Sequence, residues 1–128
     1  MSKEEVLHAY RKLMRTSLQA VQYSKPARFA VRDIINEAFR EQPATAFSAF
    51  RIKNTIEFLE TAKQQNGFEH KIVKNLTMVK YWQKMNRDKT MLTTANNDYT
   101  RDIRLQTRLQ FSATLTMLNE SLGTCLAI

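Results

Sequence analysis

The chain contains few of the residues that interrupt helices or cross-link a fold. Its 128 residues include two glycines, two prolines and one cysteine. An all-β domain needs turn residues every few positions, so this scarcity favours long helices with few breaks. The single cysteine, Cys125, excludes an internal disulfide and a multi-cysteine metal site. We therefore expect one all-α domain, in which Cys125 is a small apolar residue near a chain end.

The sequence also lacks a long apolar run and the motifs of the common enzyme classes. No apolar run approaches the roughly 18 residues that a membrane span needs, and no signal peptide is visible. There is no glycine-rich phosphate loop. His8 and His70 lie far apart, and neither has a neighbour at metal-ligand spacing, so both are interpreted as surface histidines. We expect a protein that is not an enzyme.

Acidic residues are scarce relative to basic ones. Twenty Lys and Arg face 12 Asp and Glu, which gives a formal net charge of +8. Residues 1–85 carry 15 basic and 8 acidic side chains, whereas residues 86–128 carry 5 and 4. Such a balance attracts nucleic acid, an anionic membrane or an acidic protein. The excess of positive charge belongs to the first two thirds of the chain.

Capping signals and prolines divide the first half of the chain into three predicted helices. The S-x-x-E pattern at residues 2–5 is a capping box, which starts a helix near residue 3. Pro26 suits the first position of a second helix, which is expected to run to about Arg40. A third helix is expected from about Ser48 to just before Gly67, a typical helix stop. Its expected inner face is Ile52, Ile56, Leu59 and Ala62.

The second half of the chain is predicted to hold two further helices around a polar linker. The linker is residues 86–98, and the last helix is expected over roughly 99–122, before Gly123. The expected inner positions, spaced as in a helix, are Ile72, Leu76, Val79 and Trp82, then Phe111, Leu115, Leu118 and Leu122. The organisation predicted is a helical bundle over 1–85, the linker, and a helical extension over 99–128.

The stretch LHAYRKLMR resembles the start of the LYR-motif (complex 1 LYR-like) family of small mitochondrial helical proteins. The matching residues are Ala9-Tyr10-Arg11, Leu13 and Arg15, and Phe39-Arg40 matches a phenylalanine and basic residue near the end of the family's second helix. The resemblance covers about residues 3–85. The stretches AVQYSKPARFAVRD and FEHKIVKNL further resemble an uncharacterised fungal branch of the family.

The sequence also departs from the family pattern. Ala9 replaces the leucine of the motif, a substitution that several members tolerate. Asn36 stands three residues before Phe39, where the family often has arginine. Residues 86–128 have no counterpart that we identify in the family.

The resemblance implies an antiparallel three-helix bundle with additional C-terminal helices, located in the mitochondrial matrix, that binds acylated mitochondrial acyl carrier protein. In that family the carrier's 4′-phosphopantetheine arm and acyl chain enter the bundle between its helices. This chain would then hold no cofactor directly, since the carrier supplies the acyl-4′-phosphopantetheine. The candidate carrier-binding residues are Tyr10, Arg11, Lys12, Arg15 and Arg40.

The chemistry of an acyl chain matches what these helices offer. Burying a methylene group is favourable by about 0.8 kcal/mol, so the chain needs a slot lined by apolar side chains. The candidate slot residues are Leu13, Met14, Ile35, Phe39 and Ile56. Basic side chains beside the slot could meet carrier carboxylates and the phosphodiester through charge-assisted hydrogen bonds. The Tyr10 ring can pack in the bundle while its hydroxyl reaches a polar partner.

The surplus positive charge is informative about the large mitochondrial assembly to which the chain would attach the carrier. It favours a ribonucleoprotein, so we favour the mitochondrial ribosomal large subunit or its biogenesis as this partner, with a contact to rRNA. The candidate RNA or partner surface consists of Arg28, Arg32, Arg101, Arg104 and Arg108. An accessory subunit or assembly factor of a respiratory complex, or an iron–sulfur delivery adaptor, stays open. A stand-alone nucleic-acid-binding helical module is a third alternative, without a helix-turn-helix or aromatic RNA-binding signature to support it.

Overall fold

The chain folds into helices joined by short connections. The computed structural model describes residues 2–42, 48–90 and 98–126, except for the side chains of 86–90 and 98–101. Within these ranges every regular element is a helix, which confirms the predicted all-α class. The helices are α1 (Lys3–Ala20), α2 (Ala27–Glu41), α3 (Ala49–Gln64), α4 (Phe68–Thr90) and α5 (Asp98–Leu122).

Local chemistry at the helix ends follows the sequence closely. The Ser2 hydroxyl accepts a hydrogen bond from the Glu5 amide, and the Ser2 amide donates to the Glu5 carboxylate, which completes the predicted capping box. Ser48 caps α3 by accepting from the Arg51 amide. Pro26 is the residue before α2 rather than its first residue. These caps fix where the helices of the bundle begin.

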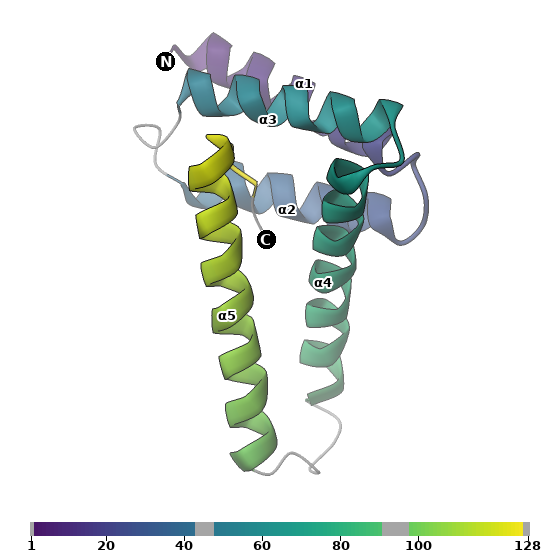
Figure 1. Ribbon diagram of the computed structural model, residues 1–128, viewed down its shortest axis with the longest axis vertical. Helices are drawn as coiled ribbons and strands as arrows, with labels where there is room; N and C mark the ends of the chain where they lie inside the picture. The colour runs from purple at the N-terminus through teal and green to yellow at the C-terminus, as the bar shows by residue number, and fades with distance from the viewer. Residues whose placement is uncertain (1, 43–47, 91–97, 127–128) are drawn as a thin grey trace.

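The first three helices run back and forth, and α4 crosses them. In Figure 1, α1, α2 and α3 alternate in direction, whereas α4 and α5 extend along the long axis of the molecule. α1 packs against α2 and α3, and α4 packs against the same two helices. The antiparallel arrangement of α1–α3 therefore agrees with the predicted bundle, and α4 is a fourth wall of it.

A contiguous apolar core lies between these four helices. α1 and α2 contribute buried side chains at helical spacing, and α3 contributes four, because its apolar positions face inward together. The buried core residues are Ala9, Leu13, Ala20, Val21, Val31, Ile35, Ile52, Ile56, Leu59, Ala62 and Val73. The α3 face predicted from periodicity is confirmed.

Two predictions for α4 are wrong in detail. The buried positions are Val73, Leu76 and Thr77, and Trp82 is half exposed, because α4 meets the bundle with its first half. The predicted linker at 86–98 also begins later, since α4 continues through Thr90. The polar composition of residues 86–90 suits an exposed helix end as well as a loop, and periodicity could not separate the two.

The last helix differs from the others in how little it buries. Ile103, Leu105 and Leu109 in its first half are exposed, and among the described residues α5 adds nothing to the apolar core. Leu122, predicted on an inner face, is 44% exposed. Figure 1 shows that the final turns of α5 approach α2 and α3, while its first turns lie far from them. α5 therefore joins the bundle at its C-terminal end.

Candidate functional site

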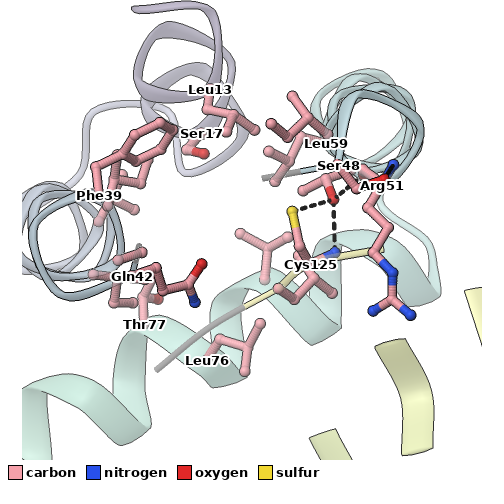
Figure 2. A pocket seen from close by; sticks show the side chains of 18 residues that line it. Leu13, Ser17, Phe39, Gln42, Ser48, Arg51, Leu59, Leu76, Thr77 and Cys125 are labelled. Atoms are coloured by element: carbon pink, nitrogen blue, oxygen red, sulfur yellow. Dashed lines mark hydrogen bonds between the residues drawn. The ribbon is translucent and has the colours of Figure 1, made fainter. Parts of the chain in front are cut away.

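An apolar cavity of about 120 Å³ lies inside the bundle, between α1, α2, α3 and α4. Figure 2 shows Leu13 on one side of it, Phe39 on another and Cys125 across from Phe39. Its wall is Leu13, Ser17, Val31, Ile34, Ile35, Ala38, Phe39, Gln42, Ser48, Arg51, Ile52, Thr55, Leu59, Val73, Leu76, Thr77, Cys125 and Leu126. Most of these side chains are hydrocarbon, so the cavity suits an apolar occupant.

The polar side chains of the wall mostly have partners already. The Thr55 hydroxyl donates to the Arg51 carbonyl, and the Thr77 hydroxyl donates to the Lys74 carbonyl. These hydroxyls are therefore satisfied within their own helices and require no polar group from an occupant. Gln42, at the end of α2, reaches toward the space in Figure 2. It is the polar group best placed to meet the head of a ligand.

The cavity brings together three of the five residues predicted to line an acyl slot. Leu13, Ile35 and Phe39 belong to its wall. Met14 and Ile56 do not: Ile56 is a buried core residue, and Met14 packs against the core. Sequence periodicity identifies the inner stripe of a helix, but which part of that stripe meets a void depends on the opposing helices.

Tyr10 of the LYR-like stretch is anchored in the bundle by two contacts. Its hydroxyl donates a 2.7 Å hydrogen bond to Oδ1 of Asn36, and its ring meets the Phe39 ring edge to face at 5.2 Å between centroids. Asn36 is the position at which the sequence departs from the family pattern. Here it holds the tyrosine hydroxyl, and Tyr10 in turn packs beside a wall residue of the cavity.

Exposed basic side chains flank this tyrosine. Arg11, Lys12 and Arg15 on α1 and Arg40 on α2 are all exposed, and within the described ranges none of the four forms an ion pair. Arg11 and Arg40 each follow a member of the Tyr10–Phe39 contact along the chain. Only Arg11 and Arg40 are thus tied by sequence to the contact between α1 and α2, and Lys12 and Arg15 are exposed elsewhere on α1.

The five arginines predicted as an RNA or partner surface do not form one surface. Arg32 lies exposed on α2, and Arg28 is half buried, with its guanidinium 4.8 Å from the Phe29 ring. Arg104 and Arg108 are exposed in the first half of α5, far from α2 in Figure 1. The side chain of Arg101 lies outside the described residues. Helical spacing groups residues within one element but does not place two elements side by side.

A segment that sequence reasoning assigned to the extension completes the cavity. After α5 the chain turns at Gly123, whose φ is +65°, and residues 123–126 return to the bundle. The Asn54 side-chain amide donates to the Gly123 carbonyl at 3.1 Å, and the Cys125 backbone amide donates to the Thr55 hydroxyl at 2.9 Å. We call residues 123–126 the closing segment. Its signal in the sequence is an apolar pair, Cys-Leu, two residues after the helix stop at Gly123.

Within the described part of the chain, no group of three or more His, Cys, Asp or Glu side chains is arranged to hold a metal ion. No described helix combines the length and apolar character of a membrane span.

Comparison with known proteins gives one informative similarity. Over 75 residues the chain is 35% identical to a UPF0593 mitochondrial protein of Schizosaccharomyces pombe, an alignment that covers 57% of this chain. The same alignment spans 60% of that protein's length. No family model matches the chain. No solved structure matches it either. The chain is thus similar to a mitochondrial protein, and its LYR-family membership stays a prediction.

Proposed function

We propose that this chain is a non-catalytic adaptor that binds acylated acyl carrier protein in the mitochondrial matrix, with the acyl chain in the bundle cavity. The observation that carries the proposal is the apolar cavity, whose wall includes Leu13, Ile35 and Phe39. Each methylene that leaves water for such a wall is stabilised by about 0.8 kcal/mol. The chain itself would supply no cofactor, because the 4′-phosphopantetheine arm belongs to the carrier.

The charge around the cavity supports a carrier as the source of the acyl chain. Arg11, Lys12 and Arg15 on α1 and Arg40 on α2 are exposed and form no ion pair within the described ranges. An acidic carrier helix and the phosphodiester of the arm are complementary to such a surface. Tyr10 would act as a positioning residue, since it links α1 to Asn36 and Phe39 on α2. The similarity to a mitochondrial protein supports the compartment.

The direct test is a titration of the purified chain with acyl carrier protein in two forms. Carrier loaded with a tetradecanoyl group should bind about a hundredfold more tightly than the same carrier with a free thiol, because several methylenes leave water. Equal affinity for the two forms would show that the acyl chain does not bind in the cavity. Absence of binding by both would reject the carrier as partner.

A pair of variants tests the basic surface. Arg11→Ala combined with Arg15→Ala should weaken carrier binding at least about tenfold, and the loss should shrink as salt is added. Arg108→Ala on α5 is the matched control and should change the affinity less than about twofold. Equal losses in both proteins would show that net charge matters rather than the α1 surface.

We further propose that the adaptor attaches the carrier to the mitochondrial ribosomal large subunit during its biogenesis. The support is the net charge of +8, which favours an RNA-rich partner. Affinity purification from mitochondria, with mass spectrometry, should recover the carrier and large-subunit proteins. Recovery of respiratory-complex subunits or iron–sulfur assembly proteins in their place would favour those clients. RNA without the carrier would favour a stand-alone nucleic-acid-binding module.

A further inference from the structure

The size of the cavity conflicts with a long acyl occupant. A cavity of roughly 150 Å³ in a protein core accommodates benzene, a molecule of six carbons. The cavity here is about 120 Å³. In the described conformation it therefore covers about six carbons of a chain. The remaining carbons of a longer acyl chain project from the open side of the cavity unless part of the wall moves.

The closing segment is a part of the wall that lies outside the four bundle helices and reaches them from the end of α5. Three hydrogen bonds link it to α3: one from Asn54 to Gly123, one from the Cys125 amide to Thr55, and one between the Thr55 hydroxyl and the Cys125 sulfur. The four bundle helices pack on one another through a cluster of buried apolar side chains that includes no residue of α5 or the closing segment among the described residues. Leaving the wall would cost the closing segment a few contacts and would leave the core intact.

The closing segment holds its shape through Asn119 of α5 rather than through the bundle. The Asn119 amide donates to the Leu126 carbonyl at 2.7 Å, and its Oδ1 accepts from the Leu126 amide at 2.9 Å and from the Thr124 hydroxyl at 3.0 Å. The segment and the end of α5 are thus one hooked unit. Such a unit can dock or undock as a whole, without first losing its own structure.

Leu126 is the side chain that an acyl chain would replace. It is buried, it lines the cavity, and its surroundings are the apolar side chains that a ligand would contact. A hydrocarbon ligand and a leucine offer this wall equivalent chemistry, so they compete for the same space.

We propose that the closing segment sets the chain-length selectivity of the cavity by competing with the acyl chain. Chains of about six carbons or fewer bind with the segment docked, whereas chains of about 14 carbons bind only after they displace Cys125 and Leu126. This inference rests on the proposed function in taking an acyl chain as the occupant. Docking of the segment and binding of a long chain are then mutually exclusive.

The chain offers a reversible lock for testing this competition. The Thr55 hydroxyl lies 3.2 Å from the Cys125 sulfur, and Cys125 is the only cysteine, so Thr55→Cys creates a single pair of thiols at short range. Oxidation should link them and hold the segment on α3. The reduced form of the same protein is the control, and the wild-type chain with and without reductant controls for the reductant itself.

Free fatty acids are the probe, because they present the acyl chain without the carrier. Oxidised Thr55→Cys should bind tetradecanoate at least about tenfold more weakly than the reduced form, while the affinity for hexanoate should change less than about twofold. In the wild-type chain, tetradecanoate should also abolish the hydrogen-exchange protection of the Cys125 amide, which donates to Thr55 of α3, whereas the Leu126 amide keeps its bond to Asn119. Equal affinity of both redox forms for tetradecanoate would overturn the proposal.

A shortened chain provides an independent test if the disulfide does not form. A chain that stops after Leu122 lacks the closing segment and should bind tetradecanoate about tenfold more tightly than the full chain. An unchanged affinity would overturn the proposal. Both tests should be repeated with carrier loaded with a hexanoyl or a tetradecanoyl group, which separates the proposed function from the proposed competition. A redox effect on fatty-acid binding without any carrier binding rejects only the proposed function. Carrier binding without a redox effect rejects only the competition between the closing segment and the acyl chain.

Discussion

Helices α3 and α5 form from similar residues but bury their apolar side chains to different extents. Ile56 in α3 is 8% exposed, whereas Ile103 in α5 is 45% exposed, although both occupy helix interiors rich in apolar side chains. α3 contacts α1 and α4 along its length, and α5 meets the bundle through its end and the closing segment. The stability of the fold therefore resides mainly in α1–α4, whereas α5 is a peripheral helix that carries the closing segment to the cavity wall.

Equivalent substitutions in the two helices should show the largest difference in their effect on the free energy of unfolding. Ile56→Ala opens a void in the core and should lower the free energy of unfolding by about 3 kcal/mol. Ile103→Ala removes an exposed side chain and should change it by less than about 0.5 kcal/mol. Urea unfolding followed by circular dichroism measures both. Similar losses would mean that α5 is as integral to the fold as α3.

The turn after α5 provides the next largest effect. Gly123 has a φ of +65°, and an added methyl group would lie 3.0 Å from Nδ2 of Asn54, so Gly123→Ala should weaken docking of the closing segment by about 1–2 kcal/mol. Loss of hydrogen-exchange protection at the Cys125 amide, which donates to Thr55 of α3, would report the weaker docking. Gly67→Ala is the matched control, because the nearest atom there, Oε2 of Glu69, is 3.6 Å away. If Gly123→Ala kept full protection, the segment would not depend on this turn.

A smaller effect is expected where α1 meets α2. Tyr10→Phe keeps the edge-to-face contact with Phe39 but removes the hydrogen bond to Asn36, which should cost about 1 kcal/mol. Tyr23→Phe, at an exposed tyrosine in the turn after α1, should cost almost nothing. Thermal unfolding of both variants tests the difference. Equal melting temperatures would mean that the Asn36 bond adds no net stability.

The smallest effect is expected at the surface between α2 and α4. Lys84 pairs with Asp33 at 3.4 Å, and both side chains are exposed, so Lys84→Ala should lower the free energy of unfolding by less than about 0.5 kcal/mol, and this small loss should shrink further as salt is added. Lys80 pairs with Glu37 and is more buried than Lys84, so Lys80→Ala should lower the free energy of unfolding by more than Lys84→Ala. A reversed order in urea unfolding would show that burial does not set the worth of these pairs.

Local signals in the sequence predicted the helices well. The capping box at Ser2, the stop at Gly123 and the α3 stripe of Ile52, Ile56 and Leu59 all depend on residues within a few turns of one another. Such interactions are encoded by spacing along the chain, so periodicity and capping rules recover them. The all-α class followed for the same reason.

The cavity could be predicted only in part, because its wall is assembled from distant residues. Leu13, Ile35 and Phe39 could be named from their helical stripes, but Thr55 and Cys125 meet across about 70 residues of sequence. The end of α4 at Thr90 was missed as well, since polar residues serve equally in an exposed helix and in a loop. Contacts between elements depend on packing, which a single sequence does not reveal.

The central claim is that the acyl chain of a carrier enters the cavity of α1–α4. Its most direct test is photo-crosslinking with carrier that bears a tetradecanoyl chain with a diazirine near its end, followed by mass spectrometry. We predict labels on cavity residues such as Leu13, Phe39 and Leu59. Labels on the exposed α5 residues Leu105 and Leu109, or on the carrier alone, would contradict the account.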